Sequence, residues 1–187
     1  DTEFATILGD LFVEAIVAPD FSDDAVAQLQ KERKNCRLLK VPQKYDGKNW
    51  EIRGVHRGVL LQNTDMGDPQ SATFDVVSDR QPTEEEVAAL KFAWNVVQHI
   101  KSNCIVVANK DATVGVGGGL PSRVDAAKLS VLKAGDKAKG AVMASDAFFP
   151  FADGLLTTAE AGATAVIQPG GSMRDDEDIA AADEVGL

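Results

Sequence analysis

The sequence predicts an α/β fold, and two features of the chain support this prediction. Short apolar runs of strand length alternate along most of the chain with segments in which apolar residues recur every three or four positions, the spacing of an amphipathic helix. The 187 residues are 44% hydrophobic and 26% charged, which suffices for one sizeable core or for two small subdomains that share one. A disordered or low-complexity chain is excluded, and no internal repeat is found.

Eight apolar runs are predicted as strands. Several end at a proline or a glycine, which interrupts regular pairing. The runs 51–55 and 58–63 are expected to pair with each other, and 104–108 is expected to form a hairpin with 113–116, ended by the glycines 117–119. The predicted strands are residues 12–18, 36–41, 51–55, 58–63, 104–108, 113–116, 140–144 and 163–167.

Five segments are predicted as helices: residues 22–34, 83–100, a segment from 121 past 131, and residues 155–161 and 176–185. The clearest start is Thr83, because Glu86 three residues later completes a capping box. Ser22 is expected to cap the first helix, and Gly186 to end the last one. Residues 43–49 are predicted as a polar loop and 66–82 as a long connection. A further strand should follow the last helix in such a series, so the chain is expected to be incomplete.

Charge and composition exclude several function classes. The chain has 19 Lys and Arg against 29 Asp and Glu, a formal net charge of −10, so nucleic-acid binding through a broad basic surface is excluded, although a local pocket for one phosphate is not. There is no apolar run of about 18 residues and no signal peptide, which predicts no membrane span and a cytoplasmic protein. Cys36 and Cys104 are interpreted as small buried hydrophobes, and His56 and His99 as structural or surface residues.

Three glycine-rich or aromatic segments are candidates for chemistry. Residues 115–123 (GVGGGLPSR) lead from a strand through glycines to a helix start and an arginine, which fits either an anion site or a plain connection. Residues 145–153 (SDAFFPFAD) follow a buried strand and form either a loop that stacks a flat heteroaromatic ligand or an aromatic plug of the core. Residues 168–174 (QPGGSMR) favour simple helix capping by Ser172 over a ligand site.

These segments together resemble the formyltransferase part of the family that couples AICAR transformylase with IMP cyclohydrolase in purine biosynthesis. The resemblance lies in residues 12–41, 93–103, 115–127 and, above all, 142–183, which contain VMASDAFFPFADG and AVIQPGGSMRDDEDIAAADE. It implies a cytidine-deaminase-like three-layer α/β/α sheet without zinc. Residues 1–82 would be the end of a first transformylase subdomain with its connection, and residues 83–187 a second subdomain that lacks its final strand and tail.

The resemblance also implies an activity: formyl transfer from the co-substrate 10-formyltetrahydrofolate to the amine of AICAR, in a homodimer with shared active sites. Asn103 matches an active-site asparagine that orients the amine and the formyl group, Arg123 an arginine that contacts the nucleotide, and Phe148 a phenylalanine beside the carboxamide. Asp153 matches the acid that holds the pterin. The resemblance further places Phe149 and Pro150 in the folate pocket, and a potassium ion on Ser102, Asp146 and carbonyls near Val96 and Ile100.

This sequence also departs from the family pattern. Ala152 stands where arginine is common and Leu120 where glutamine is common, and the family's Lys–His pair, its terminal segment and its cyclohydrolase domain fall outside this sequence. The chain alone is therefore expected to bind parts of the ligands and to turn over poorly. Three hypotheses follow: a transformylase piece that is active within a fuller assembly, a catalytically incomplete half-domain that serves as a ligand-binding or dimerisation module, or a piece that carries the family's cyclohydrolase activity.

Overall fold

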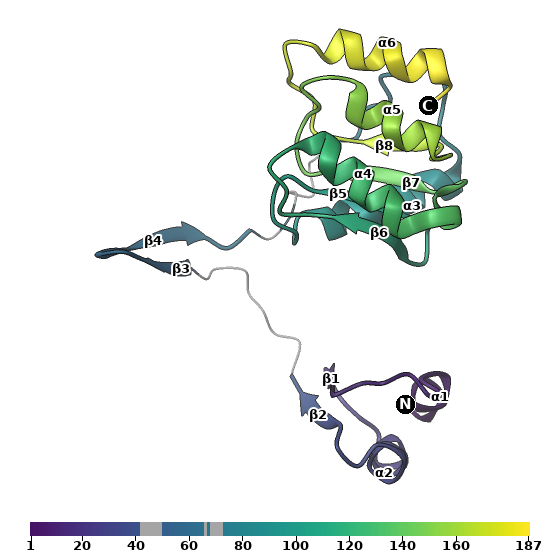
Figure 1. The fold of residues 1–187 in the computed structure, drawn as a ribbon. Coiled ribbons are helices and arrows are strands. Elements are labelled where there is room, and N and C mark those ends of the chain that lie inside the picture. The colour runs from purple at the N-terminus through teal and green to yellow at the C-terminus, as the bar shows by residue number, and fades with distance from the viewer. Residues whose placement is uncertain (42–49, 66, 68–72) are drawn as a thin grey trace. The chain divides into compact units, whose positions relative to one another are not determined.

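The structure, a computed structural model, describes residues 1–41, 50–65, 67 and 73–187. The chain divides into two compact units, Asp1–Met66 and Gly67–Leu187. Helices and strands are both present, as the predicted α/β class requires (Figure 1). The loop predicted at 43–49 and part of the connection predicted at 66–82 lie outside the described residues, and the described part of that connection contains no helix or strand. No helix in the described ranges is long and apolar enough to cross a membrane.

The first unit contains a small βαβ motif and a hairpin. Strand β1 (Ala15–Ala18) pairs in parallel with β2 (Arg37–Lys40), and α2 (Asp23–Glu32) connects them. A short helix that the sequence did not predict, α1 (Thr2–Ile7), packs with α2 through Ala5 and Leu29. It begins at Asp1, whose carboxylate accepts from the amide of Phe4. Six residues give too little apolar periodicity for such a helix to be predicted.

Strands β3 (Trp50–Val55) and β4 (Gly58–Asn63) form the predicted antiparallel pair, in register from Trp50 opposite Asn63 to Val55 opposite Gly58. Alternation along the strands places Trp50, Ile52, Val59 and Leu61 on one face of this hairpin. The other face carries the polar residues Glu51, Arg53 and Gln62 together with Val55 and Leu60. The first face is therefore the more apolar of the two.

The second unit is built on a four-stranded sheet in the order β6-β5-β7-β8 (Figure 1). Its strands are β5 (Ile105–Ala108), β6 (Thr113–Gly117), β7 (Val142–Ser145) and β8 (Ala165–Ile167). Strand β5 is antiparallel to both β6 and β7, whereas β8 is parallel to β7. The start of β5 and the ends of β6, β7 and β8 therefore share one edge of the sheet, and the candidate site lies there.

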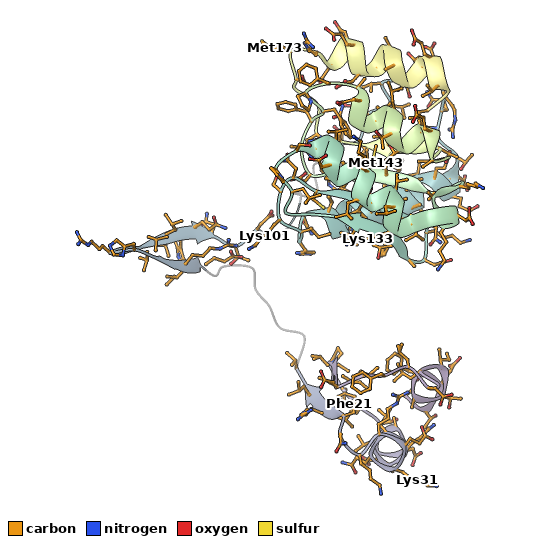
Figure 2. The ribbon with its side chains drawn as sticks, in the orientation of Figure 1. Phe21, Lys31, Lys101, Lys133, Met143 and Met173 are labelled. Atoms are coloured by element: carbon orange, nitrogen blue, oxygen red, sulfur yellow. The ribbon has the colours of Figure 1, made fainter. Side chains whose placement is uncertain are left out.

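Helices cover both faces of this sheet. On one face, α3 (Glu84–Val97) packs Ala89, Ala93 and Val97 against Val106 and Ala144. On the other face, α4 (Arg123–Ala134) packs Ala126 and Ala127 against Ile105 and Met143. Figure 2 shows Met143 inside this packed body and Met173 on the loop before α6, and their side chains are fully buried and fully exposed, respectively. Helices α5 (Asp153–Glu160) and α6 (Asp175–Val185) pack together through Leu155 and Ala182.

Two glycines explain why α4 lies so close to the sheet. A Cβ on Gly115 would overlap the carbonyl oxygen of Ser130, and one on Gly117 would overlap that of Ala126. The helix backbone therefore rests directly on β6. Both glycines belong to the GVGGGLPSR segment, and they serve helix–strand packing. Of the two interpretations of this segment, an anion site or a plain connection, the role of these glycines favours the plain connection.

The helix caps correct two predictions. The capping box at Thr83 and Glu86 is confirmed, but Ser22 makes no capping hydrogen bond although it is the N-cap of α2. Helix α6 begins after Arg174 rather than at Ser172, because the Asp175 carboxylate accepts from the amides of Gly171 and Ser172 and so closes the turn before the helix. Gly186 ends α6 in the left-handed conformation, as predicted.

The ends of several elements also differ from the prediction. Helix α3 ends at Val97 rather than near Ile100, and α5 begins at Asp153, two residues early. Strand β1 is shorter than predicted and begins at Ala15. Element ends depend on local hydrogen bonds that apolar periodicity does not determine.

Candidate ligand-binding site

The shared edge of the sheet contains a cavity of about 450 Å³. A volume of this size is typical of small-molecule pockets. Three short segments line it: Asn103 two residues before β5, the start of α4, and the phenylalanine turn that follows β7 and leads into α5. The lining residues are Asn103, Pro121, Ser122, Arg123, Val124, Ala147, Phe148, Phe149, Pro150, Phe151 and Asp153.

Arg123 lies at the centre of a hydrogen-bond network beside this cavity. Its Nη1 donates to Asp146 Oδ1 at 2.5 Å and to Ser145 Oγ at 2.9 Å, and its Nη2 donates to Asn103 Oδ1 at 2.9 Å. The Arg123 and Asp146 side chains are only 8% and 13% exposed. Three of the five guanidinium N–H groups are thus engaged within the protein. A buried arginine held in this way is rigid and positively charged at one wall of the pocket.

Asp146 is stabilised as a carboxylate. Burial alone would raise its pKa, but hydrogen bonds from Ser102, Arg123 and the amide of Cys104, together with the charge of Arg123, hold the pKa below its ordinary value. The amide of Cys104 donates to Asp146 Oδ1 at 2.8 Å. Burial, followed by the negative charge of Asp146, raises the pKa of the Cys104 thiol to about 12. Cys104 is therefore a neutral, buried thiol and no nucleophile at physiological pH.

The phenylalanine turn divides its three rings between core and pocket. Phe149 is fully buried in the core under α4, and its amide donates to Gln168 Oε1 at 2.8 Å. Phe148 and Phe151 are 42% and 56% exposed. Arg174 lies over the ring of Phe151, with 5.0 Å from Cζ to the ring centroid. One ring therefore fills the core, as the aromatic-plug interpretation predicts, and the other two are exposed, so that stacking of a ligand on them stays a prediction.

Asp153 lies in the first turn of α5, where its carboxylate accepts from the amide of Gly154 at 2.9 Å. This carboxylate is exposed at the pocket and carries a formal negative charge there. The site thus presents a guanidinium and an amide on one wall, exposed aromatic rings on another, and the exposed carboxylate of Asp153, which retains lone pairs beyond its hydrogen bond from Gly154. Such a set suits a ligand with a polar, partly anionic region and a flat ring that carries N–H donors.

Six of the eight site residues predicted from the sequence line this cavity: Asn103, Arg123, Phe148, Phe149, Pro150 and Asp153. The other two, Ser102 and Asp146, lie behind Arg123 and Asn103. Sequence reasoning missed the contact of Ser145 with Arg123 and that of Gln168 with Phe149. Ser145 and Gln168 belong to two of the candidate segments, but nothing in their spacing predicts that they contact Arg123 and Phe149.

The structure gives no support for the potassium ion that the resemblance implied at Ser102 and Asp146. The charge of the Asp146 carboxylate is already compensated by Arg123, and its Oδ1 also receives the amide of Cys104. Within the described ranges, no group of three or more His, Cys, Asp or Glu side chains is arranged to hold a metal ion. The potassium assignment stays a prediction.

The fold and the cavity together define an α/β protein with a preformed pocket, lined by polar and aromatic side chains, at one edge of its sheet. The sequence model of the AICARFT/IMPCHase bienzyme family matches residues 1–133. The chain therefore belongs to this family, as the resemblance indicated.

Relatives named bifunctional purine biosynthesis protein PurH align with the whole chain. The protein from Desulfitobacterium hafniense is 51% identical over 191 aligned residues, and that from Chloroflexus aurantiacus is 50% identical over 190. The protein from Listeria monocytogenes is 46% identical over 187. These alignments cover 100% of this chain but only 36%, 37% and 36% of the respective relatives, so the chain spans little more than a third of their length.

Proposed function

We propose that the chain carries part of a formyltransferase site, which transfers the formyl group of 10-formyltetrahydrofolate to the amine of AICAR in purine (IMP) biosynthesis. The observation that carries this proposal is the convergence of Asn103, Arg123, Phe148 and Asp153, from three separate segments, on one cavity. The proposal includes a cytidine-deaminase-like arrangement of the sheet, a cytoplasmic location and a homodimeric assembly. Membership of a bienzyme family supports it.

The residues fit the demands of this reaction. An amine conjugated with a heteroaromatic ring is a weak nucleophile, so catalysis depends on holding it against the formyl carbon and on stabilising the oxyanion that forms. The amide of Asn103 and the positive charge of Arg123 lie together on one wall and serve both needs. Phe148 supplies a rigid apolar surface for a ring, and the Asp153 carboxylate accepts N–H donors of a pterin.

The same list of residues limits what the chain does alone. None of the described residues that line the cavity is a histidine, lysine or cysteine, so the described lining offers no group that exchanges a proton near neutral pH. We therefore expect ligand binding by this chain and turnover only when further residues join the site.

Isothermal titration of the 187-residue chain with AICAR, and separately with a folate analogue, tests this function. Asn103→Ala and Phe148→Ala should each weaken AICAR binding by about tenfold or more, equivalent to about 1.4 kcal/mol. Asp153→Asn should weaken the folate analogue selectively. Phe12→Ala, at an exposed phenylalanine of the first unit, is the control and should change neither. Unchanged AICAR affinity in both Asn103→Ala and Phe148→Ala would exclude the proposal.

A second candidate function, a dimerisation module, is favoured by the β3–β4 hairpin. Its apolar face exposes Trp50, Ile52, Val59 and Leu61, each more than half accessible. A two-stranded hairpin that exposes such a face is stabilised when a partner surface covers it. Ile52→Glu should lower the dimer fraction in sedimentation velocity, whereas Arg53→Glu, on the opposite face, should not. A chain that dimerises but binds neither AICAR nor the folate analogue would favour this second function.

A further inference from the structure

Arg123 links Ser145, Asp146 and Asn103 in one hydrogen-bond network, and the chemistry of each group determines which one donates. The Ser145 hydroxyl donates to the carbonyl of Ala147 at 2.6 Å, so its lone pairs are left to accept from Arg123. Asp146 is an acceptor only, and Arg123 is a donor only. The guanidinium is therefore held at Nη1 by two side chains that follow each other at the end of β7.

This arrangement determines which way the Asn103 amide faces. The two ends of an asparagine amide have the same shape, so hydrogen bonds alone select its orientation. Because Nη2 of Arg123 can only donate, Asn103 Oδ1 must face it, at 2.9 Å. Nδ2 then donates to the carbonyl of Leu120 at 3.0 Å. One N–H of the amide and one lone pair of Oδ1 remain for a ligand in the cavity.

We propose that Asp146 and Ser145 are positioning residues of the candidate site, which hold Arg123 and, through it, fix the amide orientation of Asn103. Neither residue lines the cavity, so both act on the ligand through Arg123 and Asn103. When Nη1 loses one of these partners, the guanidinium is held less firmly against Asn103 Oδ1, and the hydrogen bond from Nδ2 to the Leu120 carbonyl alone still orients the amide. A ligand selected by one orientation is then bound more weakly. The inference rests on the proposed function only for the identity of that ligand, AICAR.

The test uses the 187-residue chain, with two readouts. The first is the side-chain amide signals of Asn103 in ¹⁵N–¹H NMR spectra, assigned by their loss in Asn103→Ala. The second is the AICAR dissociation constant from titration calorimetry. Asp146→Asn should shift or broaden the Asn103 amide signals and weaken AICAR binding by about tenfold. Ser145→Ala, which keeps the ion pair and so protects the fold, should change both readouts in the same direction and by less.

The matched control breaks an ion pair elsewhere in the same unit. Arg80 Nη1 donates to Glu86 Oε2 at 3.1 Å at the start of α3, and neither residue lines the cavity. Glu86→Gln should lower the unfolding temperature but leave the Asn103 amide signals and the AICAR affinity unchanged. If the ion pair of Asp146 had only a structural role, Asp146→Asn would likewise lower the unfolding temperature and leave the Asn103 amide signals and the AICAR affinity unchanged.

A double variant shows whether the effect passes through Asn103. In an Asn103→Ala background, Asp146→Asn should weaken AICAR binding by a smaller factor than in the parent chain, because only the effect through Arg123 itself remains. The inference is overturned if Asp146→Asn and Ser145→Ala both leave the Asn103 amide signals unchanged, whatever they do to stability. If the signals shift but AICAR binds to neither the parent chain nor the variants, the positioning role stands and the proposed function fails.

Discussion

Arg123, at the first position of α4, and Asp146, directly after β7, form a nearly buried ion pair in which Nη1 lies 2.5 Å from Oδ1. The pair joins the helix on one face of the sheet to the strand end at the candidate site. Removing one partner of a buried ion pair leaves an uncompensated charge, which typically costs about 3–5 kcal/mol. This contact therefore couples the stability of the second unit to the geometry of its pocket.

The stability contributed by Asp146 should depend on pH. The folded state lowers the pKa of Asp146. The ionised carboxylate therefore stabilises the fold at every pH above the ordinary aspartate pKa, and this contribution is lost as the pH falls through the lowered pKa of the folded state. Asp146→Asn should thus destabilise the second unit strongly near neutral pH and progressively less in acid. Urea denaturation of both proteins at about pH 7 and about pH 3.5 measures the difference. An equal difference at both pH values would contradict this account.

Asp178 should be replaceable with a gain in stability. Its side chain is 1% exposed, and neither carboxylate oxygen has a hydrogen-bond partner in the described structure. Burial, followed by the charges of Asp175, Glu177 and Asp153, raises its pKa. The folded state therefore favours the neutral acid. The free energy of unfolding decreases as the pH rises from the ordinary aspartate pKa to the raised pKa of Asp178.

Asp178→Val should increase the free energy of unfolding by about 1–3 kcal/mol near pH 7, the typical penalty for an unsatisfied buried group. The gain should shrink toward about pH 4, where the parent carboxyl is protonated more fully. Asp176→Asn, at an exposed position in the same turn, is the matched control and should change stability little. A loss of stability in Asp178→Val at neutral pH would contradict the prediction.

Phe148 and Phe149 are adjacent in sequence but should respond differently to truncation. Phe149→Ala removes a fully buried ring from the core and should cost about 3–5 kcal/mol of stability. Phe148→Ala removes a ring that is 42% exposed at the pocket, so it should cost less stability and chiefly weaken AICAR binding. Thermal unfolding combined with titration calorimetry separates the two effects. Similar losses of stability in both variants would be inconsistent with the structure.

Gly117→Ala should displace α4, because the added methyl group would overlap the Ala126 carbonyl. Overpacking of this kind typically costs about 1–3 kcal/mol. Since α4 begins with Arg123, AICAR binding should weaken as well. Gly54→Ala is the control, because a Cβ there meets nothing within 4 Å. Wild-type stability and affinity in Gly117→Ala would show that the helix has room to move.

The sequence by itself determined most of the local structure. Within the described residues, apolar periodicity located the five longer helices and the eight strands, and the Thr83–Glu86 spacing determined a capping box that the structure contains. The spacing of the β3–β4 and β5–β6 runs determined their antiparallel pairing. These features depend on residues a few positions apart, so local hydrogen bonding and amphipathicity suffice to specify them.

Only the tertiary structure decided which side chains meet. Arg123 and Asp146 are 23 residues apart, and their pairing exists because β6 and β7 end at the same edge of the sheet. Nothing in the run of phenylalanines distinguishes the buried Phe149 from the exposed Phe148. Sheet order and helix packing set these contacts, and both arise from chain segments far apart in sequence, whose relative positions no local pattern encodes.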